Sequence, residues 1–352
     1  MDFDINALQI QFAEWGQKPS HADRLLREFY NHAGVVDLER LKIGKALTER
    51  LQKEISLRQS HVLARRESAD GTVKLLVGFE RGGAVESVLM PTNYAERAAG
   101  CLSSQIGCAM GCDFCASTRH GLERNLDAGE IVEQFLRLKE EAARPTASPR
   151  RLSTVVFMGM GEPLLNLDAV LTAIRRIAGK GMGEIGGKQI MVSTVGIVPG
   201  IMKLAEADLK VTLALSLHAP DDATRSRIIP ANKRYPVREI IAATKHFYEI
   251  TGRVTNIEYC LLSGVNDSDA HARALADLLK GFRTHVNLIP YNATGASNSG
   301  VVYQAPSPER VAAFAAIVRG GGLLTHLRRA RGNDVGAACG QLRETSLASG
   351  SI

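Results

Sequence analysis

The sequence lacks any long apolar run, and nothing in it favours export. No stretch of its 352 residues approaches the run of about 20 apolar residues that a membrane-spanning helix needs. The N-terminal sequence MDFDINALQI contains no basic region and no long apolar run, which argues against a signal peptide. We therefore expect a cytoplasmic protein without membrane contact, in a compartment that keeps thiols reduced.

A strong excess of one charge and an internal repeat of fixed period are also missing. The formal net charge is +6, a mild excess that fits a partner carrying phosphates but does not require one. Apolar residues make up 45% of the chain and charged residues 23%, as in ordinary globular proteins. A chain of this length can bury a full core, so we expect one large domain with a small appendage.

Cysteines are few but concentrated. Four of the six lie in the stretch CLSSQIGCAMGCDFCAST, where Cys108, Cys112 and Cys115 have the spacing C-x3-C-x2-C and Cys101 stands seven residues upstream. Such a group in a reducing compartment indicates metal or redox chemistry rather than a disulfide framework. A structural zinc site usually needs four protein ligands, and no second pair of cysteines follows, although His120 is a candidate for the fourth ligand.

The first 93 residues suggest two small units. Residues 1–60 have apolar residues at helical spacing, with Ser20 as a possible N-cap of a helix that ends near Gly34 and a second helical pattern over 38–55. Residues 61–93 change to short strands, and TVKLLVGFE and AVESVLMP, separated by RGG, indicate a β-hairpin linker. We therefore expect a helical accessory domain, then a hairpin that carries Glu86.

Residues 94–345 alternate strands with amphipathic helices, before a short tail at 346–352. The strand candidates are CLSSQIG, STVVFMGM, QIMVSTVG, VTLALSLHA, VTNIEYCLLSG and HVNLIPYN, with helices such as DAGEIVEQFLRLKEEAA and VREIIAATKHFYEITG between them. This alternation predicts an α/β fold with a parallel sheet, and six units make a partial (β/α)6 barrel. Active sites of such sheets form at the carboxyl ends of the strands, where the cysteine loop lies.

The cysteine loop resembles that of radical S-adenosylmethionine (SAM) enzymes, which have C-x3-C-x-aromatic-C after the first strand of a partial barrel, with Phe114 here as the aromatic residue. The resemblance implies a [4Fe-4S] cluster on Cys108, Cys112 and Cys115, with SAM on the open iron. The stretch MGMGEPLLN follows the second strand, and Gly161 and Glu162 match the superfamily motif that holds the SAM amino group. By contrast, GKGMGEIGGK precedes a strand and is predicted to be a connector.

The motifs CLSSQIGCAMGCDFCAS, MGMGEPLLN, VSTVG, SLHAP, NLIPYN and RGNDVGAACGQL together resemble the RlmN/Cfr family of radical SAM RNA adenine methyltransferases, most closely its RlmN branch. The resemblance covers essentially the whole chain. It implies methylation at adenine C2 with two SAM molecules per turnover, whereas the Cfr branch methylates C8 with the same cysteines. It also implies that the SAM pocket is lined by Gly161, Glu162, Ser193, Ser216, Leu217, His218 and Asn292.

The family resemblance implies roles for three further residues. Cys339 carries a methyl group as S-methylcysteine, which fits a soft thiolate nucleophile, and Cys101 then resolves the protein–RNA intermediate through a transient disulfide. Glu86 occupies the family position of the proton acceptor. Cys260 lies in an apolar strand, so we expect it to be a small core residue.

The implied partners are 23S rRNA and tRNA, with an external electron donor of the flavodoxin or ferredoxin type and a monomeric enzyme. Basic residues that would engage phosphates are Arg24, Arg27, Lys42, Lys45, Arg328, Arg329 and Arg331. Two other classes remain open: a radical SAM enzyme that only abstracts hydrogen and has no need of Cys339, and an RNA-binding protein with a structural metal.

Overall fold

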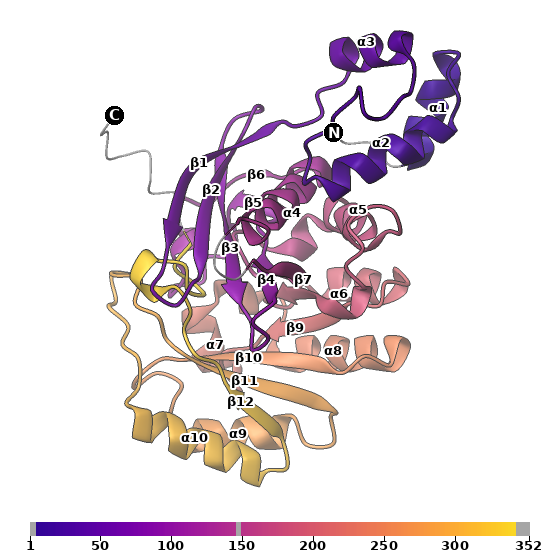
Figure 1. The fold of residues 1–352 in the computed structure, drawn as a ribbon. Helices are drawn as coiled ribbons and strands as arrows, with labels where there is room; N and C mark the ends of the chain where they lie inside the picture. The colour runs from indigo at the N-terminus through magenta and orange to yellow at the C-terminus, as the bar shows by residue number, and fades with distance from the viewer. Residues whose placement is uncertain (1–4, 146–148, 343–352) are drawn as a thin grey trace.

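A computed structural model describes residues 5–145 and 149–342. Its main feature is a ten-stranded sheet in the order β1-β2-β3-β4-β7-β8-β9-β10-β11-β12, which curls into a partial barrel (Figure 1). Strands β4 to β12 in this order pair in parallel, and β1 to β3 add an antiparallel extension at the β4 edge. The parallel strands are β4 (Arg97–Cys101), β7 (Arg151–Phe157), β8 (Ile190–Thr194), β9 (Thr212–Ser216), β10 (Thr255–Leu261), β11 (Thr284–Pro290) and β12 (Leu324–Leu327).

The predicted α/β partial barrel is confirmed, with two differences in its strands. The first strand was expected to be CLSSQIG, but β4 ends at Cys101, and β5 (Gln105–Gly107) pairs instead with β6 (Leu122–Asn125) in a separate two-stranded sheet. In addition, β12 extends the six predicted strands, and its four residues are too short to give a recognisable pattern.

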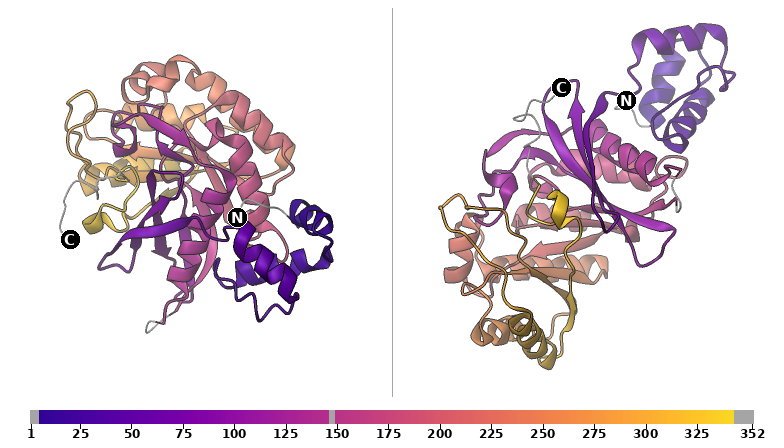
Figure 2. Two further views of the ribbon diagram at one scale, coloured as in Figure 1. Left: turned by 90° about the horizontal axis from the view of Figure 1, so that it is seen from above. Right: turned by 60° about the vertical axis from the view of Figure 1, so that its left-hand side comes forward.

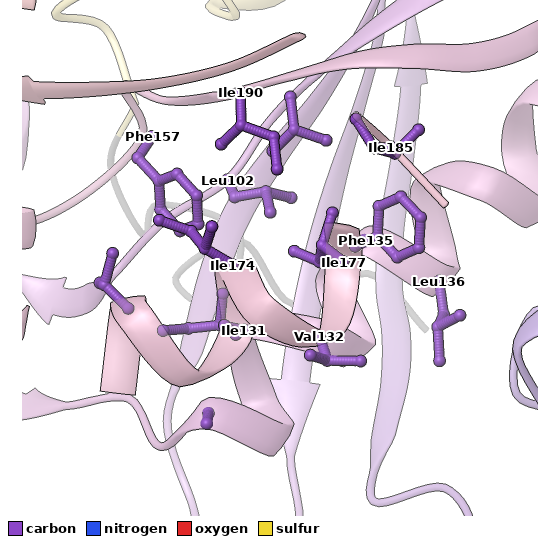
Figure 3. Close-up of a cluster of buried hydrophobic side chains, with 14 of the residues drawn as sticks. Leu102, Ile131, Val132, Phe135, Leu136, Phe157, Ile174, Ile177, Ile185 and Ile190 are labelled. Atoms are coloured by element: carbon purple, nitrogen blue, oxygen red, sulfur yellow. The ribbon is translucent and has the colours of Figure 1, made fainter. Parts of the chain in front are cut away.

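Helices between the parallel strands cover the outer face of the barrel (Figure 2). They are α4 (Ala128–Ala142), α5 (Leu167–Ala178), α6 (Val198–Glu206), α8 (Val237–Thr251), α9 (Asp269–Leu278) and α10 (Pro308–Gly320), whereas α7 (Asp222–Ile228) lies at the carboxyl ends of β8 and β9. Helix α4 begins with a capping box, in which Asp127 and Glu130 each accept a backbone N–H from the other. Phe135 of α4 and Ile174 of α5 are buried with Phe157 of β7 in the cluster that joins this part of the sheet to its covering helices (Figure 3).

Three helices precede the sheet, α1 (Ile5–Glu14), α2 (Ser20–Asn31) and α3 (Lys45–Glu54). They form a unit at one end of the molecule and contact α4, where Lys139 donates to the Tyr30 carbonyl at 2.8 Å. The prediction of Ser20 as N-cap is wrong, because Pro19 already has helical angles and is itself the cap position. The helical pattern over 38–55 becomes a helix only from Lys45 onward.

The antiparallel strands are β1 (Ser60–Glu67), β2 (Val73–Phe79) and β3 (Ala84–Pro91). The expected hairpin is therefore β2–β3, and β1 adds a strand that the sequence pattern did not indicate. Since β3 pairs with β4, the hairpin continues the barrel sheet. The division of the chain at residues 60 and 93 stays a prediction, and its tail at 346–352 lies outside the described residues. Within the described residues, every helix is too short or too polar to span a bilayer.

Candidate active site

Strand register brings Glu86 and Cys101 to one face of the sheet. Val88 of β3 stands directly opposite Cys101 of β4, and Glu86 lies two residues before Val88 on the same strand. Side chains alternate between faces along a strand, so the carboxylate and the thiol point to the same side. Both side chains are buried. The structure thus places a potential base beside a potential resolving thiol.

The loop after β5 carries Cys108, Cys112 and Cys115. Its shape is fixed by backbone bonds, including Cys108 N–H to the Gly121 carbonyl at 2.8 Å, and by the Thr118 hydroxyl, which donates to the Cys112 carbonyl at 3.1 Å. Burial raises the pKa of Cys108 to about 12, and the charge of Cys115 adds to it. Burial and the charges of Cys115 and Cys108 likewise raise the pKa of Cys112. The three thiols are therefore close together and poorly solvated.

This donor set suits an iron–sulfur cluster. Within residues 5–145 and 149–342, no three His, Cys, Asp or Glu side chains converge as the ligands of a single metal ion do. A [4Fe-4S] cube binds each cysteine through a different iron, so its three sulfur atoms stand further apart than the ligands of one ion. Buried thiols that hold their protons in the free chain become thiolates when metal binds.

The loop after β11 holds the cysteine loop in place through hydrogen bonds. Asp113, between two of the cysteines, accepts from the Ser299 hydroxyl at 2.6 Å, from Ser299 N–H at 2.9 Å and from the Tyr303 hydroxyl at 2.6 Å. Burial acts to raise the pKa of Asp113, but these hydrogen bonds outweigh it and lower the pKa. Arg119 also donates to the carbonyls of Thr294 and Ala296. The polar loop after β11 is thus part of the site.

Gly161 and Glu162 follow β7 against the start of β5. Gly161 has φ +96°, and a Cβ atom there would stand 2.5 Å from the Gln105 Cβ, so only glycine fits. The Glu162 carboxylate accepts from Leu164 N–H at 3.1 Å and Val195 N–H at 2.9 Å. Burial nevertheless raises the pKa of Glu162 to about 7. A buried acid of this kind favours a cationic ligand group beside it.

Ser193 and Ser216 lie at the carboxyl ends of β8 and β9, with their hydroxyl oxygens 3.2 Å apart. His218 has φ +58°, and its Nδ1 accepts from Cys260 N–H at 2.9 Å. Burial, with the charge of Arg225, lowers the pKa of His218 to about 3, so its ring is neutral. Leu217 differs from these residues because its side chain is fully buried in the core. Its predicted contact with SAM stays a prediction.

Cys339 lies in the last described segment, across the barrel opening. Asn292 donates to its carbonyl at 3.3 Å, and Gly340 accepts from Ala116 N–H at 2.8 Å, which ties the segment to the cysteine loop. Cys339 is solvent-accessible although many protein atoms surround it. This crowding and the charge of Glu258 raise its pKa, while Arg328 acts to lower it.

Electrostatic effects link Cys101, Cys115 and Cys339. Burial raises the pKa of Cys101 to about 12, and the charge of Cys339 adds to that rise. The charge of Cys115 in turn raises the pKa of Cys339. Thiols separated by more than two hundred residues in the sequence therefore lie within electrostatic reach of each other. Cys260 is buried as expected, and its thiol also feels the charges of Cys339 and Cys115.

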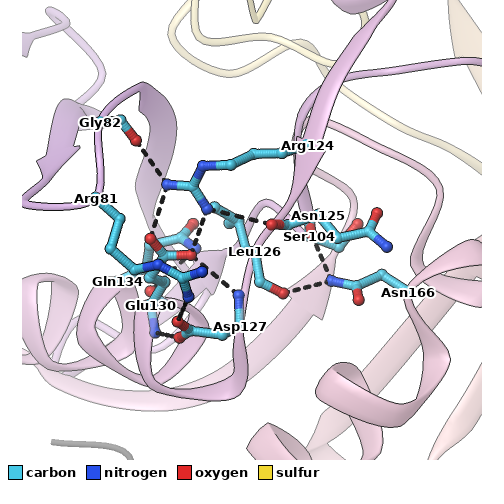
Figure 4. A network of polar contacts seen from close by, with 10 residues as sticks. All are labelled: Arg81, Gly82, Ser104, Arg124, Asn125, Leu126, Asp127, Glu130, Gln134 and Asn166. Atoms are coloured by element: carbon cyan, nitrogen blue, oxygen red, sulfur yellow. Dashed lines mark hydrogen bonds and ion pairs between the residues drawn. The ribbon is translucent and has the colours of Figure 1, made fainter.

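A polar network fixes the stretch between Cys101 and α4 (Figure 4). Arg124 of β6 binds both oxygens of Glu130 at 2.8 Å and donates to the Gly82 carbonyl in the β2–β3 turn at 2.6 Å. Asn166 donates to the carbonyls of Ser104 and Leu126 at 2.8 and 2.7 Å. The hairpin bearing Glu86, the cysteine loop and the start of α5 are thereby held in a fixed arrangement.

The predicted RNA-contacting cations fall into two groups. Arg24, Arg27, Lys42 and Lys45 are exposed on the N-terminal helical unit, where Arg24 also donates to the Leu41 carbonyl. Arg328 and Arg329 are exposed after β12, and Arg331 is half-buried there. The second group leads directly into the Cys339 segment.

Sequence reasoning missed three charged residues of the site. Lys74 lies in β2 and contacts Glu86, Glu258 lies in β10 near Cys339, and Arg225 of α7 is buried. Arg225 donates to the carbonyls of Leu217, Val195 and Ser216. A single charged residue inside an otherwise apolar strand was the available signal for Lys74 and Glu258.

Comparison with known proteins gives consistent results. The family model described as "Radical SAM superfamily" matches residues 102–276. The "Probable dual-specificity RNA methyltransferase RlmN 1" of Opitutus terrae is 54% identical over 97% of this chain and 96% of its own length. The corresponding protein of Thermus thermophilus is 47% identical over 86% and 83%.

A solved structure agrees over the whole fold. The crystal structure of a radical SAM methyltransferase from Sphaerobacter thermophilus has a TM-score of 0.91 to this chain, with 40% identity over 97% of this chain and 98% of the other. Sequence and structure thus match the same kind of enzyme over nearly the full length. The chain belongs to the radical SAM superfamily and, within it, to the RlmN family of RNA methyltransferases.

Proposed function

We propose that this enzyme methylates C2 of adenosine in 23S rRNA and in tRNA, by way of a methyl group carried first on Cys339. The observation that carries the proposal is the convergence of Cys339 and Cys101 beside the cysteine loop. Relatives named as dual-specificity RNA methyltransferases support the choice of RNA as substrate.

Three cysteines, Cys108, Cys112 and Cys115, would hold a [4Fe-4S] cluster. When bound there, that cluster would supply the electron for reductive cleavage of SAM to a 5′-deoxyadenosyl radical. Glu162 would accept hydrogen bonds from the SAM amino group, and Gly161 allows the close packing against Gln105 that positions Glu162. Ser193, Ser216, Leu217, His218 and Asn292 would complete the SAM pocket.

Adenine C2 is an electron-poor carbon, so it cannot take a methyl group from SAM by ordinary displacement. Cys339 as a thiolate would accept the methyl group instead, and Arg328 nearby favours that thiolate. The 5′-deoxyadenosyl radical would take a hydrogen atom from the S-methyl group, and the resulting methylene radical would add to adenine C2. Glu86 would then remove the C2 proton, and one electron would pass back to the redox partner. Cys101 as a thiolate would attack the Cys339 sulfur and break its bond to the carbon, which takes up a proton to become the methyl group of the released RNA and leaves a disulfide.

Nucleoside analysis tests this function. Anaerobic reaction with SAM, reductant and unmodified 23S rRNA or tRNA should yield 2-methyladenosine by mass spectrometry. Finding 8-methyladenosine would assign the chain to the Cfr-like reaction, since both reactions use the same cysteines. Cleavage of SAM without any methylated adenosine would contradict RNA methylation and favour a hydrogen-abstracting radical SAM enzyme.

The affinity for SAM should fall in acid because of Glu162. Its pKa of about 7 lies above the ordinary value, so the free site loses its carboxylate charge as the pH drops through 7. We expect SAM to bind about ten-fold more weakly for each pH unit below that point. Anaerobic equilibrium binding to the cluster-loaded enzyme measures this. The Glu162→Gln variant should bind SAM weakly, with little dependence of the affinity on pH. If this variant showed the same pH dependence of SAM affinity as the wild type, the assignment would be contradicted.

The macromolecular partners follow from the same proposal. The exposed cations of the N-terminal helices and of the segment before Cys339 would engage RNA phosphates. The target adenosine would be extruded from folded RNA to reach the barrel opening. The electron donor is expected to be a flavodoxin-like or ferredoxin-like protein, and the enzyme a monomer in the cytoplasm.

A further inference from the structure

Lys74 is a buried lysine at the edge of the proposed catalytic face. Its side chain is only 10% exposed, although lysine is among the residues that are rarely buried without a partner. The ammonium nitrogen lies 2.8 Å from the Glu86 Oε1 and donates to the Gly336 carbonyl at 3.0 Å. One cation therefore contacts the proposed base and the chain three residues before Cys339.

Strand register explains why these groups meet. Lys74 of β2 stands opposite Val88 of β3, and Val88 stands opposite Cys101 of β4, so all three lie in one row across the sheet. Directly paired residues point to the same face, as does Glu86, two residues before Val88. The ammonium thus reaches across the same face that carries the base and the resolving thiol.

The segment that holds Cys339 rests on this face through several contacts. Asp334 accepts from the Ser68 hydroxyl at 2.6 Å and from Ala69 N–H at 3.2 Å. Gly332 N–H donates to Asp70 at 3.1 Å, so the β1–β2 turn fastens the start of the segment. Among these contacts, the one made by Lys74 also reaches the base.

We propose that Lys74 is a positioning residue that couples the base to the methyl-carrying segment. Its charge keeps Glu86 as a carboxylate in a buried place, because a buried acid without a cation favours its neutral form. Its bond to Gly336 holds the turn before Cys339 against the same face. This inference rests on the proposed function of Glu86 and Cys339, which it extends.

The first test measures the segment itself and does not depend on catalysis. Hydrogen–deuterium exchange of amides in residues 332–342 of the cluster-loaded enzyme should become about ten-fold faster in Lys74→Met, since one buried hydrogen bond is lost. Ser68→Ala, which loosens the same segment without touching Glu86, should show a similar increase. Unchanged exchange in Lys74→Met would overturn the positioning role.

The second test separates charge from anchoring. Lys74→Met should form methylated adenosine at least about a hundred-fold more slowly than Ser68→Ala, because only the former also leaves the base without its cation. Lys74→Arg should restore part of this rate, and added methylamine should restore part of it in Lys74→Ala. Equal rates in Lys74→Met and Ser68→Ala would overturn the coupling to the base.

A double variant and the activity of the wild-type enzyme allow both tests to be interpreted. If Lys74→Met does not fold, the double variant Lys74→Met/Glu86→Met removes both buried charges, and its faster exchange in residues 332–342 gives the same support. Unchanged exchange in that variant would again contradict the anchor. If wild-type enzyme makes no methylated adenosine, the proposed function fails, whereas the exchange data still decide whether Lys74 holds the segment.

Discussion

Replacing Cys101 by alanine should leave the RNA covalently attached to the protein. In the proposed reaction, the carbon bridge between Cys339 and adenine is broken when a second thiol attacks the Cys339 sulfur, and we assign that attack to Cys101, whose pKa is raised by the charge of Cys339. We expect multiple turnover to fall about a thousand-fold or more, as with loss of other nucleophiles, because each enzyme stops after one event. Denaturing gels with labelled RNA would show the crosslink, and mass spectrometry would place it on Cys339.

Cys260→Ala provides a matched control for this experiment. Its thiol is buried and also lies within electrostatic reach of Cys339, but it has no role in the proposed reaction. This variant should release methylated RNA normally and show no crosslink. Release of methylated RNA at the wild-type rate by Cys101→Ala would remove Cys101 from the mechanism.

Replacing Cys339 by alanine should abolish methyl transfer at its first step. No other described residue is proposed to accept the methyl group, so neither the protein nor the RNA should gain it, and product formation should drop by about a thousand-fold or more. The cluster should remain, because its proposed ligands lie on a separate loop. Intact-protein mass after incubation with SAM, and iron and sulfide content, measure the two properties.

The double variant Cys101→Ala/Cys339→Ala tests whether Cys339 is the attachment site of the crosslink. If the crosslink of Cys101→Ala runs through Cys339, removal of both thiols should eliminate it. A crosslink that persists would indicate a different attachment site. Methylated adenosine formed by Cys339→Ala would contradict the S-methylcysteine route as a whole.

The architecture was largely predictable because it depends on local patterns. Apolar periodicity located α4 to within one or two residues, and the alternation of strands with helices predicted the barrel. The prediction of the first strand was wrong because CLSSQIG has the pattern of one uninterrupted strand. In the structure, Ser103 N–H donates to the Gln134 side chain, so the chain leaves the sheet after Cys101. Gln134 lies on α4, 31 residues further along the chain, so a short stretch of sequence around Ser103 does not reveal this contact.

The site was predictable only in part. The three-cysteine spacing is a local signal, but the meeting of Cys339 with Cys101 depends on the whole fold and was inferred from the family resemblance. The role of Lys74 could not be predicted because it depends on contacts with two residues distant in the sequence or on another strand, Glu86 and Gly336. A charged residue in an apolar strand marks such a position but does not reveal what it contacts.

The contact between the β1–β2 turn and the Gly332–Asp334 turn has a consequence for how the enzyme is made. The cysteine loop leaves the ribosome more than two hundred residues before Cys339, and domains fold during synthesis from the N-terminal side. The surface that receives the last segment can therefore form first, while the acceptor thiol arrives near the end of translation. A nascent chain would have the three-cysteine loop, the proposed cluster site, before it has Cys339, the proposed methyl acceptor.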